Sequence, residues 1–333
     1  MTIRDIAQRC RVSVATVSRV INESPSVSDK TREQVLRVMQ DIGYIPNVFA
    51  RGLSKNSMQM VGILCADVSR PYYAHVVSLL ERSLRQKGFD SMLCCSGYVL
   101  EDKKKCLQFL LQKKVDAIIL AGPTYNEQKD NSHIRAAAQQ VPVFLINSST
   151  DISNVYCVLC DEEDAMRKSV HDMAAAGYRD ILYLHDMVTW GWAGSQKLRG
   201  VRRGLHECGI EENPALLCAV EHGIQTAQDK ITQLLRDKIP FSGVLVSEDL
   251  LAIGVQKALH ALGESRPIIS FNNSIFTACA TPTLTSVDNM LDTICPTAVD
   301  LLARLLNGEA IPKKIAISAS LVERETFQRV NRT

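Results

Sequence analysis

The chain has 333 residues, of which 46% are hydrophobic and 22% are charged, as in a globular protein of two or three domains. No apolar run approaches the ~20 residues of a membrane helix, and no charged and apolar leader precedes the first expected helix, so we expect a cytoplasmic protein. Residues 1–57 hold nine Lys/Arg and five Asp/Glu, a net +4, whereas the rest of the chain carries −2. A basic head on a near-neutral body favours a nucleic-acid partner for the head alone.

The first residues predict two short helices separated by a tight turn. Thr2 can cap a helix over residues 3–10, and Ser13 can cap a second helix over residues 14–21. This short spacing is typical of a helix-turn-helix motif, which places its second helix in a DNA major groove. A three-helix bundle without a ligand is the alternative, but the short turn, the basic charge and the polar face of the second helix argue against it. The side chains expected to face inward are Ile3, Ile6, Ala7, Val17, Val20 and Ile21.

A third helix and a proline-led segment complete this region. Ser28 can cap a helix that Gly43 ends. Its expected buried face consists of Val35, Leu36, Met39 and Ile42. Pro46 then breaks the chain, and residues 47–53 form a short basic segment that is too short to be a stable helix alone in water. We therefore expect this segment to fold when it docks, as a wedge in the DNA minor groove.

From residue 60 onwards, apolar strands alternate with helices. Strands are expected at residues 61–67, 90–96, 116–122, 141–147, 180–186, 215–220, 241–249, 267–273 and 315–320. Helices are expected at residues 73–87, 103–112, 132–140, 164–176, 198–208, 226–237, 251–262 and 291–306. Near-continuous apolar strands separated by helices indicate parallel sheets covered on both faces. The strands are too many for one compact sheet, so we expect two α/β subdomains with a ligand cleft at the strands' carboxyl ends.

The cysteines and histidines show no catalytic or metal-binding pattern. Most of the eleven cysteines stand in apolar runs, as reduced core thiols do, although an exposed redox-sensing thiol stays open. Cys157 and Cys160 form a CxxC, but no second Cys or His pair stands at zinc spacing. The seven histidines, His75, His185 and His222 among them, form no metal-ligand spacing, and no nucleotide-binding glycine motif occurs. We therefore expect no enzyme, no cofactor and no metal.

Several stretches of the chain carry a family resemblance. The segments are TIRDIAQRCRVSVATVSRVIN, YIPNVFARGLSKN, AAAGYRDILYL, QKLRGVRRGL, VSEDLLAIGVQKAL and TPTLTSVDNM. Over essentially its whole length the chain resembles the lactose/galactose repressor (LacI/GalR) family. The resemblance implies a homodimer in which each subunit joins an all-α helix-turn-helix head to an α/β body of periplasmic-binding-protein type. The implied limits are 1–45 for the head, 46–58 for a hinge and 59–333 for the effector-binding and dimerisation domain. Within that domain the N-subdomain spans about 59–158 and 289–318, and the C-subdomain about 159–288 and 319–333.

The resemblance assigns DNA contacts to the head and hinge. Val14 and Ala15 would open the recognition helix, where apolar side chains read methyl groups or shape, so Arg19 would carry much of the polar base readout. Leu53 looks like the family's minor-groove lever, and two copies would kink a pseudo-palindromic operator. The alternative is a leucine that packs on its own domain. The other expected contacts are Thr2, Ser13, Thr16, Ser18, Asn22, Asn47, Ala50 and Arg51.

The resemblance also assigns an effector site to the body. Ser69, Tyr72 and Tyr73 follow the first strand, where the family presents aromatic side chains to its ligand. Trp190 and Trp192 share one loop, and either could stack on a sugar or pack under the loop. The chain departs from the family at Lys197, which replaces the usual arginine and loses its bidentate fork, and at the polar pairs Glu248-Asp249 and Asn272-Asn273. A pair between Lys197 and Glu248 across the cleft would leave less charge for an anionic effector, so a neutral sugar is favoured.

The stretch FNNS, followed by TPTLTSVD, is also similar to the maltose/maltodextrin-responsive repressors within the family. We therefore expect a repressor that a small neutral saccharide such as maltose releases from its operator. A corepressor-dependent regulator that responds to a sugar phosphate or another metabolite is the alternative within the family. A sugar-binding receptor without a DNA role is disfavoured by the helical head and by the lack of a leader. No membrane partner is expected, and a phosphocarrier protein, which docks on some relatives, stays a possible partner.

Overall fold

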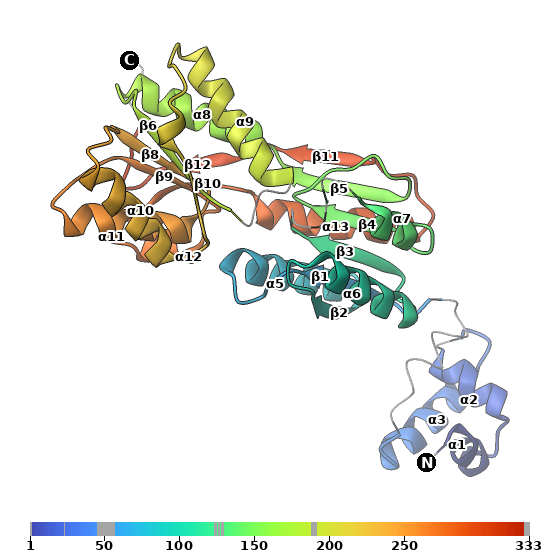
Figure 1. Cartoon of the computed structure of the whole chain (residues 1–333). Helices are drawn as coiled ribbons and strands as arrows, with labels where there is room; N and C mark the ends of the chain where they lie inside the picture. Colours follow the sequence, from blue (N-terminus) through green and yellow to red (C-terminus); the bar gives the residue numbers. More distant parts are fainter. Residues whose placement is uncertain are drawn as a thin grey trace.

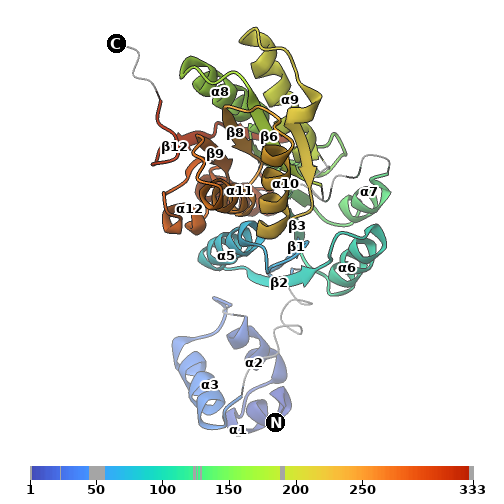
Figure 2. The same ribbon diagram turned by 60° about the vertical axis from the view of Figure 1, so that its left-hand side comes forward.

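The chain folds into a small helical head and a larger body of two lobes (Figure 1). The computed structural model describes residues 2–22, 24–44, 57–122, 125, 127, 130–187 and 192–329, with the backbone alone at residues 192 and 193. Figures 1 and 2 both show the head beside the end of one lobe and remote from the other. The expected contacts Asn47, Ala50, Arg51, Leu53 and Trp190, and the side chain of Trp192, lie outside the described residues.

The head contains the three predicted helices, α1 (Ile3–Cys10), α2 (Val14–Ile21) and α3 (Asp29–Asp41). The Ser13 hydroxyl accepts a hydrogen bond from the Thr16 N–H at 3.0 Å, and the Ser28 hydroxyl accepts one from the Thr31 N–H at 3.4 Å, so both predicted N-caps are confirmed. The small core around Ile6, Val17 and Val35 is almost fully buried. The prediction that Leu36 faces this core was wrong, because its side chain is 49% exposed.

The first lobe is a six-stranded parallel sheet in the order β11-β5-β4-β3-β1-β2. Its strands are β1 (Met60–Cys65), β2 (Asp90–Cys95), β3 (Ala117–Ala121), β4 (Val143–Ile146), β5 (Val155–Cys160) and β11 (Lys314–Ile317). Its helices are α5 (Pro71–Gln86), α6 (Leu100–Gln112), α7 (Ser132–Ala138) and α13 (Leu291–Leu306). Strands β1, β3, β4 and β5 are almost entirely buried, as expected of parallel strands covered by helices on both faces.

The second lobe repeats this plan with the strand order β12-β10-β9-β8-β6-β7. Its strands are β6 (Ile181–Asp186), β7 (Leu217–Val220), β8 (Gly243–Val246), β9 (Ile268–Phe271), β10 (Thr285–Asp288) and β12 (Ser320–Val322). Its helices are α8 (Glu162–Ala175), α9 (Trp192–Glu207), α10 (Ile224–Arg236), α11 (Asp249–Ala261) and α12 (Ile275–Cys279), with a 3-10 turn at Pro214–Leu216. β12 runs antiparallel to β10, so this sheet is mixed rather than fully parallel.

Two differences from the predicted strands show how the lobes are connected. The single strand predicted over residues 315–320 is two strands, β11 in the first lobe and β12 in the second. Strands β5 and β10 were not predicted, and each is the last strand of its lobe before the chain first crosses to the other lobe or crosses back. The chain therefore crosses between the lobes three times, after β5, after β10 and after β11.

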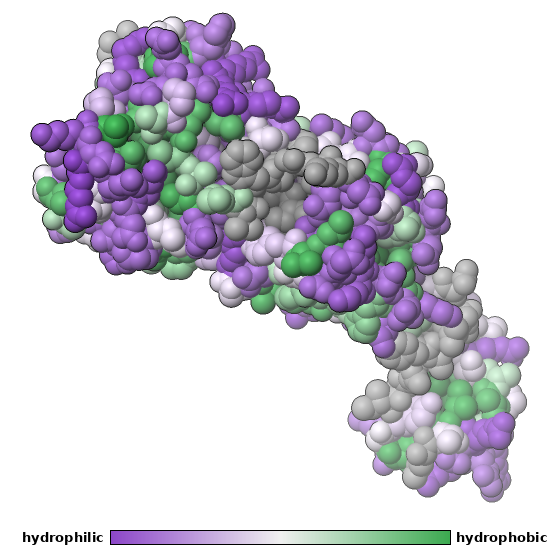
Figure 3. Space-filling view, in the orientation of Figure 1, coloured by the Kyte–Doolittle hydropathy of each residue, from purple (hydrophilic) through white to green (hydrophobic). Residues whose placement is uncertain are grey.

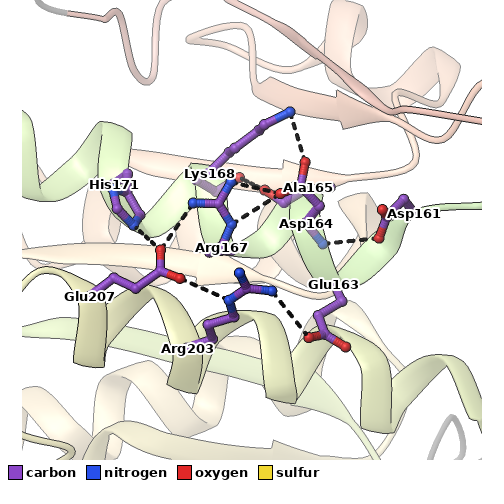
Figure 4. A network of polar contacts seen from close by, with 10 residues as sticks. Asp161, Glu163, Asp164, Ala165, Arg167, Lys168, His171, Arg203 and Glu207 are labelled. Carbon is purple, nitrogen blue, oxygen red and sulfur yellow. Dashed lines mark hydrogen bonds and ion pairs between the residues drawn. The ribbon is translucent and has the colours of Figure 1, made fainter.

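Helices α8 and α9 of the second lobe pack unusually closely. A Cβ added at Gly204 would lie 2.9 Å from the Arg167 carbonyl oxygen, and one added at Gly200 would overlap the Glu163 carbonyl. Ion pairs join the exposed edges of the two helices, among them Arg167–Glu207 at 3.0 Å and Arg203–Glu163 at 3.9 Å (Figure 4). This packing fixes the C-terminal half of α9 against α8, and the N-terminal half of α9 contributes Gly194 and Lys197 to the site described below.

The surface and the cysteines fit an ordinary globular chain. Most of the face in Figure 3 is hydrophilic, with hydrophobic residues in small groups. Among the described residues, no helix has the length and apolar character needed to cross a bilayer. The eleven cysteines are free, and six of them are buried, as predicted for core thiols; Cys95 and Cys279 are exposed.

Candidate effector site and DNA-binding face

A pocket lies between the two lobes at the carboxyl ends of their strands. The first lobe contributes Arg70, the N-cap of α5, and Tyr72 and Tyr73 from the first turn of that helix. The second lobe contributes Glu162, Asp186, Gly194, Lys197, Ser247, Glu248 and Asn272. This is the position at which open α/β sheets bind their ligands, because loops from neighbouring strands meet there. The predicted cleft is therefore present, with walls from both lobes.

The guanidinium of Arg70 bridges the two lobes. Its Nη2 lies 2.6 Å from Asp186 Oδ2 and 3.7 Å from Glu248 Oε2, and it also contacts His222 Nδ1. Its Nη1 donates a hydrogen bond to the Tyr98 hydroxyl at 2.6 Å. Burial alone would lower the pKa of Arg70, but Glu248, Tyr98 and Asp186 together raise it above its usual value. Arg70 is therefore a permanent cation held by carboxylates of the opposite lobe.

His222 completes this cluster on the second lobe. Its Nδ1 lies 3.2 Å from Asp186 Oδ2 and 2.6 Å from Glu248 Oε1. Burial lowers the pKa of His222, but the neighbouring carboxylates of Asp186 and Glu248 outweigh burial and raise it to about 9. The Asp186 side chain is only 1% exposed, so its charge depends on these partners.

A second ion pair lies on the other side of the pocket. Lys197 Nζ is 3.7 Å from Glu162 Oε1, donates a hydrogen bond to the Ser247 carbonyl at 3.1 Å and lies 3.9 Å from the centre of the Phe271 ring. Burial raises the pKa of Glu162, and Lys197 opposes that rise. The predicted pair between Lys197 and Glu248 across the cleft was wrong, because both residues belong to the second lobe and each has another partner.

The structure gathers some of the predicted effector residues and leaves others outside the pocket. Those that line it are Tyr72, Tyr73, Lys197, Glu248 and Asn272. Asp249 lies behind the pocket, where its buried carboxylate accepts hydrogen bonds from the hydroxyls of Ser270 and Ser286 and from the Ser274 N–H. Asn273 binds Asp288 and Arg324, and Ser69 is exposed beside Asp67. Asp249 and Asn273 therefore shape the strand ends that carry the site.

Sequence reasoning missed Arg70, Glu162, Asp186 and His222 as site residues. Two of these residues, together with the predicted Glu248, stand at the ends of neighbouring strands of one sheet. Asp186 ends β6, His222 follows β7 and Glu248 follows β8. Polar residues directly after successive apolar strands were the available signal, because the carboxyl ends of parallel strands meet at one edge. Spacing along the chain hid this convergence.

The exposed face of α2 carries the predicted base-reading residues. Val14 is 42% exposed, Ala15 and Arg19 are also exposed, and Val17 and Val20 are buried in the core of the head. Ser13 and Thr16 join their hydroxyls at 2.9 Å at the start of the helix, and Ser18 and Asn22 are half-buried. Thr2 is exposed at the start of α1, where its N–H donates to the Asp5 carboxylate at 2.7 Å. The second helix of a helix-turn-helix motif is thus free to enter a major groove.

Two family models match the two parts of the chain. Residues 2–47 match the lacI family of bacterial regulatory proteins, and residues 58–316 match the periplasmic binding proteins and sugar binding domain of the LacI family. An HTH-type transcriptional regulator of Lachnoclostridium phytofermentans is 42% identical over 98% of this chain and 99% of its own length. The HTH-type transcriptional regulator MalR of Clostridium butyricum is 27% identical over 98% of this chain and 99% of its own.

Solved structures agree with these matches. The lac repressor dimer bound to operator and the anti-inducer ONPF is similar with a TM-score of 0.87 and 25% identity, over 98% of each chain. The agreement covers head and body together. The chain is therefore a DNA-binding transcriptional regulator that belongs to the lacI family of bacterial regulatory proteins.

Proposed function

We propose that the protein is a dimeric repressor that a neutral saccharide releases from its operator. The observation that carries this proposal is the pairing of charges in the pocket. Each of the carboxylates Glu162, Asp186 and Glu248 already has a basic partner within 4.0 Å. An anionic effector would have to draw a basic side chain away from one of these carboxylates in a nearly buried setting, which is costly. A hydroxyl-rich neutral ligand can instead exchange hydrogen bonds with the wall.

The aromatic wall supports a sugar as the ligand. Tyr72 and Tyr73 both line the pocket, and the Tyr72 hydroxyl accepts a hydrogen bond from the Asn147 amide at 2.9 Å, which fixes its ring. The apolar C–H faces of a pyranose can lie on such a ring while its hydroxyls meet the polar groups of the second lobe. The matched sugar-binding domain description supports the same ligand class.

DNA binding is assigned to α2 and the hinge. Val14 and Ala15 would contact bases through methyl groups and shape, and Arg19 would supply the polar readout. Thr2, Ser13, Thr16, Ser18 and Asn22 would position the head on the backbone of the DNA. Leu53, with Asn47, Ala50 and Arg51 beside it, would wedge the minor groove at the operator centre.

A dimer is needed to hold two heads at one pseudo-palindromic site. Exposed apolar side chains on both lobes support such an interface: Leu93 of the edge strand β2 is 43% exposed, and Ile275 of α12 is 72% exposed. We also propose the domain limits 1–45, 46–58 and 59–333, with the subdomain division given by the sequence. The separate sheets of the two lobes support that division.

The release mechanism can be tested directly on the full chain. An operator is first selected from a random DNA library, and its affinity is then measured by fluorescence anisotropy with and without maltose. Release predicts a loss of operator affinity of roughly 5–150-fold, which corresponds to about 1–3 kcal/mol of coupling. Glucose 6-phosphate serves as the charged control and should change little. Tighter binding with either compound would overturn release and support the corepressor alternative, and failure to select any DNA would overturn the repressor itself.

A substitution of Leu53 tests the proposed wedge in the minor groove. Leu53→Ala should weaken operator binding by about tenfold or more, because the wedge that opens the central step is lost. Its maltose affinity, measured without DNA, should equal that of the wild type. Leu36→Ala is the matched control, since Leu36 is an exposed leucine of the head. Equal operator affinities for the two variants would remove the wedge role from Leu53.

A further inference from the structure

Three metal-ligating side chains converge in the second-lobe wall of the pocket. Asp186, His222 and Glu248 each offer one donor atom, and these atoms all lie within 4.8 Å of one another. Donors bound to a single divalent ion at about 2.1 Å stand about 3–4 Å apart. The side chains follow three neighbouring strands, so the sheet itself sets their spacing.

One contact in this cluster differs from an ordinary hydrogen bond. Glu248 Oε1 is buried and accepts no hydrogen bond, although His222 Nδ1 lies only 2.6 Å away. The two atoms are thus brought together without being directed at each other. Side chains that point at a common third position have this arrangement, and a buried carboxylate oxygen without a hydrogen bond is costly unless a cation compensates it.

A cation does occupy that position. Nη2 of Arg70 contacts all three side chains, at 2.6 Å from Asp186 and 3.7 Å from Glu248, and it reaches them from the opposite lobe. A guanidinium nitrogen with two protons cannot donate hydrogen bonds to three side chains equally. We propose that Asp186, His222 and Glu248 form a binding site for a divalent transition-metal ion, and that the Arg70 guanidinium competes with the ion for it.

The donor set selects the class of metal. One imidazole nitrogen and two carboxylates suit Zn²⁺, Co²⁺, Mn²⁺ or Fe²⁺, whereas Ca²⁺ and Mg²⁺ prefer oxygen alone. The two carboxylates balance the charge of the ion, and His222 releases its proton to solvent when it binds the ion. The displaced Arg70 keeps its hydrogen bond to the Tyr98 hydroxyl. Because Arg70 belongs to the first lobe, an ion at this position replaces a bond between the lobes by one within the second lobe. Metal binding is therefore coupled to cleft opening, and this inference does not depend on the identity of the effector.

Cobalt(II) is the probe that separates this site from the eleven cysteines. The full-length protein, reduced and free of chelators, is titrated with Co²⁺ while visible d–d absorption is recorded. We expect one ion per chain with d–d bands and without the near-ultraviolet charge transfer of cobalt–thiolate bonds. His222→Ala and Glu248→Gln should each weaken binding by at least about tenfold. His260→Ala is the matched control, because His260 is an exposed histidine of α11 in the same lobe, and it should bind as the wild type does.

Competition gives the sharpest test. Arg70→Gln removes the internal cation and should tighten Co²⁺ binding severalfold, the opposite of what loss of a ligand would do. Wild-type affinity in folded Glu248→Gln, or thiolate charge transfer as the main signal, would overturn the site. If circular dichroism shows that His222→Ala does not fold, Glu248→Gln alone decides whether the metal site exists. Unchanged or weaker binding in Arg70→Gln would overturn the competition.

Discussion

The two lobes have nearly the same fold but bring different chemistry to the pocket between them. Each is a six-stranded sheet flanked by helices, and each ends its strands at the cleft. The first lobe offers two tyrosines and one cation, Arg70, whereas the second offers three carboxylates and Lys197. The second lobe thus holds a charge network of its own that the first completes with a single side chain. Closure of the cleft therefore depends on Arg70 far more than on general complementarity between the walls.

Removal of Arg70 should have the largest effect on the contact between the two lobes. Arg70→Met keeps an apolar stem but leaves the buried carboxylate of Asp186 with His222 as its remaining cationic partner. Breaking one side of a buried ion pair costs about 3–5 kcal/mol, and we expect about 3 kcal/mol here because His222 still compensates in part. Urea unfolding of the full chain, followed by circular dichroism, measures the change.

A surface arginine provides the comparison for that value. Arg202 pairs with Glu212 at 2.9 Å and its side chain is 53% exposed. Arg202→Met should therefore change the free energy of unfolding by no more than about 1 kcal/mol. If Arg70→Met cost no more than Arg202→Met, the bridge between the lobes would contribute nothing, and the contrast drawn above would fail.

The sequence could predict most elements of both lobes, though not β5, β10 or α12, and only part of what these elements place together. Helix α13 was predicted at its observed limits, because an apolar stripe and the Asn307-Gly308 stop define it locally. The split of the last strand into β11 and β12 depends on which sheet each residue joins, and that information is not local. Asp249 illustrates the same limit in the site, since a polar residue after a strand can face the ligand or, as here, the serines behind it.

The position of each charged residue after a strand could be read from the sequence, but which of these residues meet could not, for a related reason. Asp186, His222 and Glu248 are separated by more than twenty residues along the chain, yet they meet because β7, β6 and β8 are neighbours in the sheet. The order of the strands in a sheet is set by how the elements pack, and the residue pattern of a single strand does not reveal that order. Lys197 and Glu248 were correctly expected in the pocket, but their partners depend on the same arrangement.

An intermediate effect is expected where α8 and α9 meet. In Gly200→Ala the new methyl group would overlap the Glu163 carbonyl and lie 2.9 Å from Met166 Cβ, so the two helices must separate. Overpacking of this kind costs about 1–3 kcal/mol. Because α9 carries Lys197, the substitution should distort the second-lobe wall of the pocket. It should not affect the fold of the head. Thermal unfolding measures the loss, with His206→Ala, an exposed site on the same helix, as the control. A midpoint no lower than that of the control would mean that the helices are not in contact at Gly200.

The smallest effect concerns the ion pairs on the edge of that helix pair (Figure 4). Hydrogen bonds from Arg203, Arg167 and His171 lower the pKa of Glu207 from 4.5 to about 2. A carboxyl group with a lowered pKa stabilises the fold above its unfolded value, here 4.5, and loses that contribution as the pH falls through about 2. The thermal midpoint of Glu207→Gln should therefore lie slightly below that of the wild type at neutral pH, and the gap should close in acid. High salt should shrink the gap as well, because the group is on the surface. The exposed Glu221, changed to Gln, should show no such gap. A difference between wild type and Glu207→Gln that persisted unchanged to pH 2 would mean that it arises from packing, and the second lobe's surface charges would then have no part in holding α9 in place.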